Sequence, residues 1–209
     1  VVPGVPSGGD DTAVLQAAIT AAGADSAVYL PSGTWRTTGL TFNGTGGFNL
    51  IGSGRTDSYI RLDPGAPGAI GLRVVNTTPG QAISCRISNI GIFVNAPSVA
   101  CTGLQLQDVG QCVLENVGIT GFNGANLDLV GLHTLGRQSL WVKNMQIGAN
   151  IPVYIDKNPN TTDGYLSADH FTFTGCYFTS VNDPDTLTWA MVLIHPDAHF
   201  SNLQFVGGA

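Results

Sequence analysis

A short pattern of apolar and polar positions recurs along the chain. An asparagine lies between apolar residues, which alternate with small or polar ones on both sides of it, in residues 87–92, 114–119 and 142–147. Alternation over so few residues predicts a strand, a bend at the asparagine and a second strand. Looser copies occupy residues 168–173 and 200–205.

The spacing of the copies predicts how they are arranged. Asn89, Asn116 and Asn144 are 27 and 28 residues apart. A period of about 20–50 residues indicates a solenoid of stacked coils. Asparagine tolerates the left-handed conformation that a one-residue bend requires. We therefore expect these asparagines to stack as a hydrogen-bonded structural ladder at a buried corner.

Another apolar run follows the bend in each coil. These runs are residues 104–107, 127–130, 153–156 and 192–195. Each is short and alternating, which predicts a third strand per coil. The solenoid is therefore expected to have three sides.

The N-terminal segment has a helical periodicity instead. Residues 10–23 predict a helix in which Asp10 or Asp11 caps the start and Gly23 ends the last turn. Its apolar stripe is Val14, Leu15, Ala18, Ile19 and Ala22. Such a helix would cover the core and the unpaired edge of the first coil.

The first 60 residues also carry a family resemblance. Residues 9–12, 16–19, 28–35 and 50–54 resemble the start of pectate-lyase-like parallel β-helix proteins, in the form found in bacteriophage tailspikes and minor tail proteins. The resemblance implies an all-β fold, a right-handed single-stranded parallel β-helix with an N-terminal capping α-helix. In phage members it further implies a homotrimer on the virion.

Length and composition fit one such domain. We expect residues 1–209 to form a single β-helix domain, with the capping helix at 10–23 and the coils at 27–209. Only 11% of the residues are charged, as expected where stacked coils bury most of each strand. The lack of an initiator Met and of a capping element after the last repeat leaves open that this is a fragment of a longer chain.

Charge and hydropathy exclude some function classes. The net charge of −6 gives no basic footprint for nucleic acid, and no apolar run approaches the length of a membrane span. The cysteines show no zinc spacing, and we expect neither metal nor cofactor. Cys85 and Cys112 each lie four residues before a repeat asparagine, which predicts that they stack inward as free thiols.

Two outward carboxylates are the candidate catalytic residues. Asp128 and Asp156 point outward if the apolar residues beside them point inward, and paired carboxylates are what glycosidases require. Counting from the asparagines stacks the two carboxylates on each other. Matching the apolar positions instead stacks Asp128 on Tyr154 and Asp156 on His195. We favour the apolar register, because a slip of one residue would expose buried side chains.

A second candidate surface follows from the strand before each asparagine. Arg86, Val113 and Trp141 occupy equivalent outward positions, so this column becomes apolar along the stack and needs a cover, either a sister chain or a sugar. The candidate binding residues are therefore Trp141, Tyr154 and His195.

These observations predict a tailspike or minor tail protein domain that is structural and binds a host-surface glycan or protein. The chain would form a homotrimer, and its partners would be other virion tail proteins and a host cell-surface glycan. It would be located in the virion tail, or otherwise in the extracellular space. The alternative is a polysaccharide lyase or glycoside hydrolase of the same fold acting on a bacterial or plant glycan. A general assembly scaffold is a third interpretation.

Overall fold

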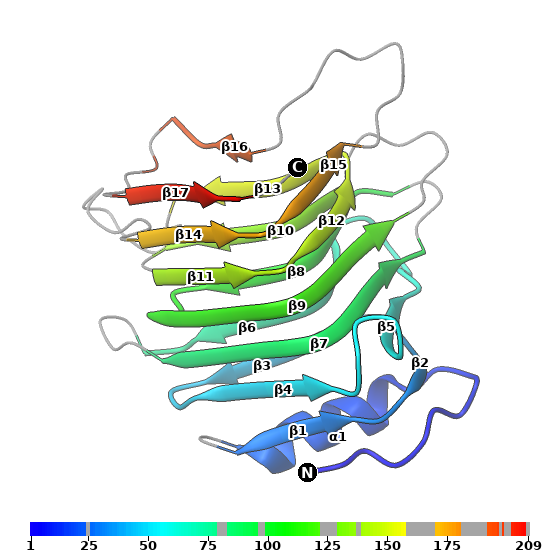
Figure 1. Cartoon of the computed structure of the whole chain (residues 1–209). Coiled ribbons are helices and arrows are strands. Elements are labelled where there is room, and N and C mark those ends of the chain that lie inside the picture. Colours follow the sequence, from blue (N-terminus) through cyan, green and yellow to red (C-terminus); the bar gives the residue numbers. More distant parts are fainter. Residues whose placement is uncertain are drawn as a thin grey trace.

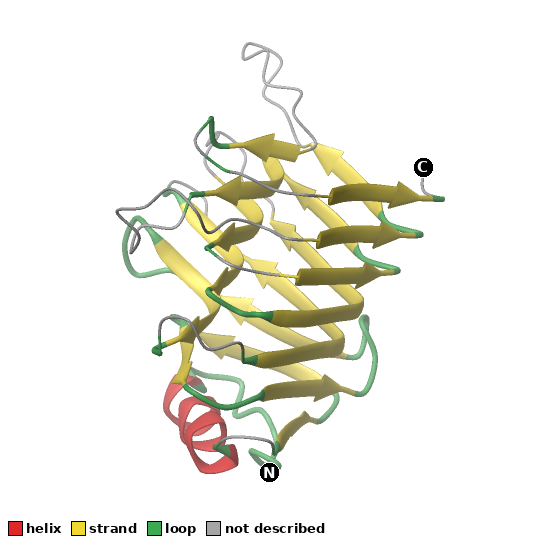
Figure 2. Ribbon diagram, turned by 90° about the vertical axis from the view of Figure 1, so that its left-hand side faces the viewer, coloured by secondary structure: helices red, strands yellow, loops and turns green. Residues whose placement is uncertain are grey.

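The chain folds as a parallel β-helix with one helix at its N-terminal end (Figures 1 and 2). The computed structural model describes residues 1–23, 26–78, 83–95, 99–121, 129–136, 139–157, 170–180, 192–196, 198 and 202–207. Within these ranges every strand pair is parallel. The predicted fold class is confirmed.

Two of the three sides belong to one bent, 11-stranded sheet. We call the side before the bend arm 1; it comprises β1 (Ala27–Leu30), β4 (Phe48–Gly52), the first parts of β7 (Ser84–Val94) and β9 (Gln111–Gly121), β11 (Ser139–Lys143), β14 (His170–Thr174) and β17 (Asn202–Val206). We call the side after the bend arm 2; it comprises β2 (Gly33–Thr37), β5 (Ser58–Leu62), the second parts of β7 and β9, β12 (Gln146–Ala149) and β15 (Tyr177–Ser180).

The third sheet closes the coils. It has six strands, β3 (Leu40–Gly44), β6 (Ala69–Asn76), β8 (Cys101–Gln107), β10 (Leu129–Leu135), β13 (Ile151–Asp156) and β16 (Val192–Ile194). Of the strand expected at 127–130, the structure describes the part from Leu129 on, and residues 122–128 lie outside the described ranges.

The repeat asparagines make the bend between the arms. Asn89, Asn116 and Asn144 have φ angles of 57°, 54° and 53°. Asn116 Nδ2 donates to Asn89 Oδ1 over 2.9 Å. In the described part of the chain, the Asn144 side chain makes no such bond, and it is exposed, whereas Asn89 and Asn116 are half-buried. The corner is therefore less buried than the sequence led us to expect, and its hydrogen bond joins two of the three coils.

The interior is filled by columns of like residues. Cys85 pairs with Cys112 in register, and both are buried free thiols, which confirms their inward stacking. Burial and the neighbouring Cys85 raise the pKa of the Cys112 thiol well above its usual value.

A glycine column lets the third sheet approach arm 2. Gly71, Gly103 and Gly131 are aligned in β6, β8 and β10 and face the column of Ile92, Ile119 and Ile147. A Cβ on Gly103 would lie 2.5 Å from Cγ2 of Ile119, which is too close for any real contact. These positions therefore require glycine for space between the walls.

Helix α1 (Thr12–Ala22) covers the first coil. It buries Leu15, Ala18, Ile19 and Ala22, but Val14, expected in the same stripe, is exposed. The side chain of Gln16 pairs with the edge of β3, because its Oε1 accepts from Thr41 N–H over 3.0 Å and its Nε2 donates to Thr41 O over 2.7 Å. The amide group thus takes the place of a neighbouring strand.

The expected capping of this helix is correct for only one of the two aspartates. Asp10 accepts from the Thr12 N–H over 2.9 Å. Asp11 makes no side-chain capping bond. Its buried carboxylate accepts instead from the backbone N–H of Ser7 over 2.9 Å and of Arg36 over 3.2 Å. It ties the N-terminal segment to β2 rather than stabilising the helix end.

Candidate binding surfaces

The outer face of arm 1 displays Trp141. In β11 the flanking Leu140 and Val142 point inward and are buried, so alternation turns the indole outward, where it is 43% exposed. Trp141 pairs with Val113 below it, and Val113 with Arg86. The outward column predicted from the sequence is confirmed in its register.

Charged side chains lie beside this column. Glu115 Oε2 is 3.1 Å from Arg86 Nη2, and its Oε1 is 3.8 Å from Lys143 Nζ. The Arg86 and Lys143 side chains are 55% and 62% exposed, so these pairs contribute little to stability and stay accessible to a ligand. We call Arg86, Val113, Glu115, Trp141 and Lys143 the Trp141 surface.

The third sheet has a different outward face from the one expected. The register pairs His133 with Tyr154 and Leu135 with Asp156. Both registers considered from the sequence are therefore wrong at β13, because they placed Asp128 opposite Tyr154 or Asp156. Asp128 itself lies outside the described residues.

One part of the favoured register is correct. Ile155 pairs with Ile194, and the His195 N–H donates to Ile155 O over 2.8 Å. His195 therefore follows Asp156 in the outward column, as expected.

Four side chains on this face form the His133 cluster, which we define as Gln105, His133, Tyr154 and Asp156. Gln105 Nε2 is 3.1 Å from His133 Nδ1, and His133 Nε2 is 3.2 Å from Asp156 Oδ2. The rings of His133 and Tyr154 are stacked, with centroids 4.9 Å apart. The cluster links three successive coils through side chains alone.

The contacts of His133 define its protonation. Because Nε2 faces a carboxylate, it carries the proton, and in a neutral imidazole Nδ1 is then the acceptor that the Gln105 amide meets. Burial lowers the pKa of His133, while the hydrogen bond to Asp156 and its charge oppose this. Burial also raises the pKa of Tyr154, and the Asp156 carboxylate adds to this.

The His133 cluster contains few groups that could take part in catalysis. Among the outward residues of the third sheet, as far as the structure describes them, Asp156 is the one carboxylate. A glycosidase needs two. The His133–Asp156 pair can accept and return a proton, and the stacked Tyr154 ring offers a flat face beside it.

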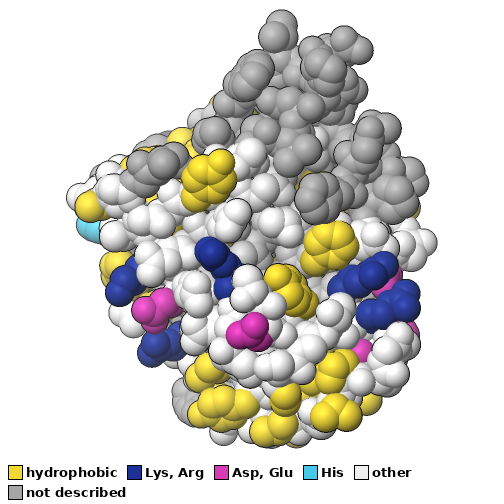
Figure 3. Space-filling view, turned by 45° about the vertical axis from the view of Figure 1, so that its right-hand side comes forward, with side chains coloured by type: hydrophobic (Ala, Val, Ile, Leu, Met, Phe, Trp, Pro, Cys, Tyr) yellow, Lys and Arg dark blue, Asp and Glu magenta, His cyan; other side chains and the backbone are white. Residues whose placement is uncertain are grey.

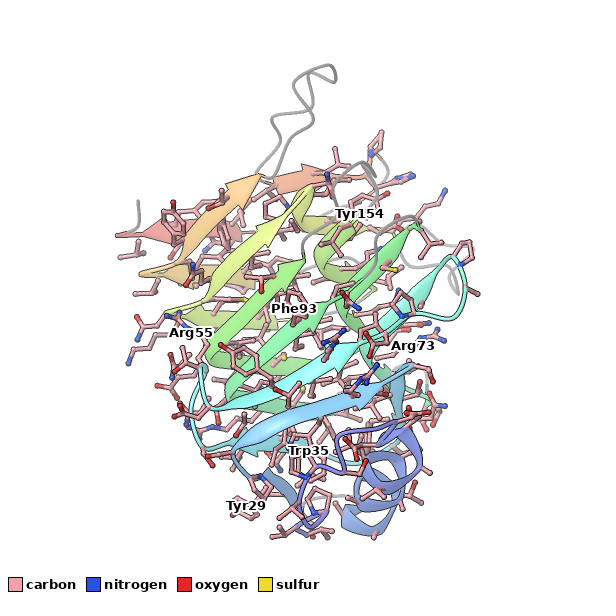
Figure 4. The ribbon with its side chains drawn as sticks, turned by 90° about the vertical axis from the view of Figure 1, so that its right-hand side faces the viewer. Tyr29, Trp35, Arg55, Arg73, Phe93 and Tyr154 are labelled. Carbon is pink, nitrogen blue, oxygen red and sulfur yellow. The ribbon has the colours of Figure 1, made fainter. Side chains whose placement is uncertain are left out.

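The predicted binding residues do not form one site. Trp141 lies on arm 1, whereas Tyr154 and His195 belong to the third sheet and its continuation (Figure 4 labels Tyr154). Within the described ranges, no group of three or more His, Cys, Asp or Glu side chains is placed to hold a metal ion. No helix described here is long and apolar enough to cross a membrane.

Sequence reasoning missed His133 and Gln105, although a signal was present. A glycine, a leucine and a polar residue recur at residues 71–73, 103–105 and 131–133. Matching these triplets gives the observed register of β6, β8 and β10.

Comparisons with known proteins support the fold. No family model and no curated protein matches the sequence. Among solved structures, the fold is similar to a chain described as Geobacillus virus E2 ORF18, with a TM-score of 0.61 and 17% sequence identity. The match covers 96% of this chain and 45% of the viral one, so this chain spans less than half the length of that protein.

Proposed function

We propose that this chain is part of a bacteriophage tail component and binds a glycan on the host surface through the Trp141 surface. The observation that carries the proposal is an exposed indole on a regular sheet with an ion-paired carboxylate and ammonium beside it. The similar fold of a protein from Geobacillus virus E2 supports the viral part of the proposal.

The Trp141 surface has the chemistry that a sugar ring needs. An indole face is large, rigid and apolar, and can stack on the C–H face of a pyranose. Glu115 accepts hydrogen bonds from hydroxyl groups, and Lys143 donates them. Because Trp141 and Lys143 lie on one strand held between two others, their spacing is fixed before the ligand arrives.

A glycan array with the purified chain should identify a ligand, and titration of that ligand should test the site. We expect Trp141→Ala to weaken binding about tenfold or more, since a stacked aromatic ring is commonly a dominant contact. The matched control is Tyr29→Ala, which removes another exposed aromatic ring from arm 1. Equal affinities of wild type and Trp141→Ala would contradict the proposal.

A homotrimer is the other way to cover Val113 and Trp141. In that arrangement sister chains bury this column, and the glycan is bound elsewhere on the virion tail assembly. Light scattering at micromolar concentration distinguishes the two, because a monomer mass leaves the column open to a sugar.

The alternative function, polysaccharide cleavage, is favoured by the His133–Asp156 hydrogen bond. We expect no turnover, since the described residues of this face place no second carboxylate beside Asp156. Release of reducing ends or unsaturated sugars from a bacterial surface glycan, abolished by Asp156→Asn or Asp128→Asn, would establish the enzyme instead.

A further inference from the structure

Arg55 crosses from its own coil to the asparagine corner (labelled in Figure 4). It lies between β4 and β5, yet its Nη1 is 3.5 Å from the carbonyl oxygen of Asn144. That contact is longer than a strong hydrogen bond, so the guanidinium keeps most of its donors available. A side chain from early in the chain thus reaches the bend beside the Trp141 surface.

Two outward glycines, Gly91 and Gly118, leave room for the side chains of Tyr59 and Arg55 to lie flat on arm 2. A Cβ on Gly118 would lie 2.9 Å from Cγ of Arg55, and one on Gly91 would lie 2.5 Å from the Tyr59 ring. Neither glycine has a φ that forbids other residues, because neither is among those with positive φ. Glycine at these positions therefore serves the close approach of Arg55 and Tyr59.

The corner is locally basic although the chain is acidic. Arg86 and Lys143 share the Glu115 carboxylate, and Arg55 reaches the Asn144 carbonyl beside them. Among the residues that the structure describes, no carboxylate lies within ion-pair distance of Arg55. The whole chain carries a net charge of −6. A negatively charged ligand is therefore attracted to this corner.

Polar and aromatic groups continue past the corner. Gln146 is exposed two residues after Asn144, and it pairs in register with Tyr177, which is 49% exposed. Figure 3 shows basic, acidic and hydrophobic side chains interspersed among uncharged ones on this side of the molecule. The surface around the corner thus offers an indole, an ammonium and an amide from one coil, the guanidinium of Arg55, and the phenol ring of Tyr177 on the next coil.

We propose that the glycan bound at Trp141 is acidic and continues round the corner. Its carboxylate or other oxyanion lies between Lys143 and Arg55, on the two sides of Asn144, and its next ring contacts Gln146 and Tyr177. This inference rests on the proposed function and adds the charge of the ligand and its direction. A guanidinium presents paired N–H donors that match an oxyanion.

The test compares two linear oligosaccharides by titration calorimetry, hyaluronan hexasaccharide, which carries a carboxylate on alternate rings, and neutral cellohexaose. Arg55→Gln should weaken binding of the hyaluronan fragment about five- to tenfold and leave cellohexaose unchanged, because Arg55 lies outside the Trp141 surface. Lys143→Gln, which removes a contact of that surface as well as a charge, should weaken the hyaluronan fragment more than cellohexaose. Binding of the acidic fragment to wild type should also weaken as salt is raised. Lys157→Gln, an exposed lysine after β13, is the charge-matched control.

A second variant separates ligand contact from folding. Gly118→Ala keeps the Arg55 charge but displaces its stem, and should weaken only the acidic fragment, with thermal melting to show that the fold is retained. Acidic binding that is insensitive to salt and to Arg55→Gln, yet lost in Trp141→Ala, would overturn the acidic ligand and leave the proposed function intact. Binding unaffected by Trp141→Ala would overturn the proposed function itself.

Discussion

The outward side chains of arm 1 and of the third sheet differ in what surrounds them. On arm 1, Arg86 and Lys143 extend into water. On the third sheet, the outward Gln105 and Gln107 are only 8% and 7% exposed, and Gln107 accepts from Arg73 Nη2 over 2.9 Å. Alternation along a strand fixes which side chains leave the core, but not whether they reach solvent. One scaffold therefore carries an accessible surface on one side and a packed polar network on another.

The largest effect expected from this contrast is on stability. Asp156→Ala should reduce the free energy of unfolding by about 2–3 kcal/mol, because it leaves the largely buried His133 Nε2–H without its charged acceptor. Glu115→Ala, which also removes an ion-paired carboxylate, should cost less than about 1 kcal/mol. Urea unfolding of the two variants measures the difference. Equal losses would mean that the two faces are energetically alike.

The asparagine corner provides a smaller contrast. Asn116→Leu should destabilise by about 1–3 kcal/mol, since it places a branched residue at positive φ and removes the hydrogen bond to Asn89. Asn144→Leu introduces the same backbone strain but breaks no such hydrogen bond. It should therefore lower the free energy of unfolding by about 1 kcal/mol less than Asn116→Leu does. Melting temperatures that agree for the two variants would show that the side-chain bond contributes nothing.

The smallest effect is the pH dependence that His133 imposes. Its folded pKa is lowered by burial, whereas an unfolded histidine titrates near about 6.5. As the pH falls below that value, the unfolded chain binds the proton before the folded one, so stability declines until the folded pKa is passed. His133→Gln should flatten this part of the stability profile, which urea unfolding at several pH values measures. A dependence of stability on pH that persists in His133→Gln would show that other groups cause it.

The fold was predictable because it depends on local chemistry repeated at a fixed interval. Asn89, Asn116 and Asn144 adopt the left-handed conformation that the sequence called for, and their apolar neighbours fix which side chains fill the coil. The position of Trp141 followed from the same short-range alternation. Each of these features lies within a few residues of a repeat asparagine.

Features that depend on loop length or on distant contacts were not predictable. Counting from the asparagine failed for the third sheet, since Gly131 lies 15 residues after Asn116 whereas its register partner Pro152 lies only eight after Asn144. That difference hid the stacking of His133 on Tyr154. Arg55 reaches Asn144 across 89 residues of sequence, and no local pattern reports such a contact.

The facing glycine and isoleucine columns also constrain how this chain can vary over evolutionary time. Gly103 and Ile119 share one volume, so an added methyl on β8 must be matched by a lost one on β9. Related sequences with alanine in place of Gly103 should therefore carry alanine in place of Ile119, because valine would keep the Cγ2 atom that blocks the site. Facing residues of the two walls would therefore be substituted together, as pairs.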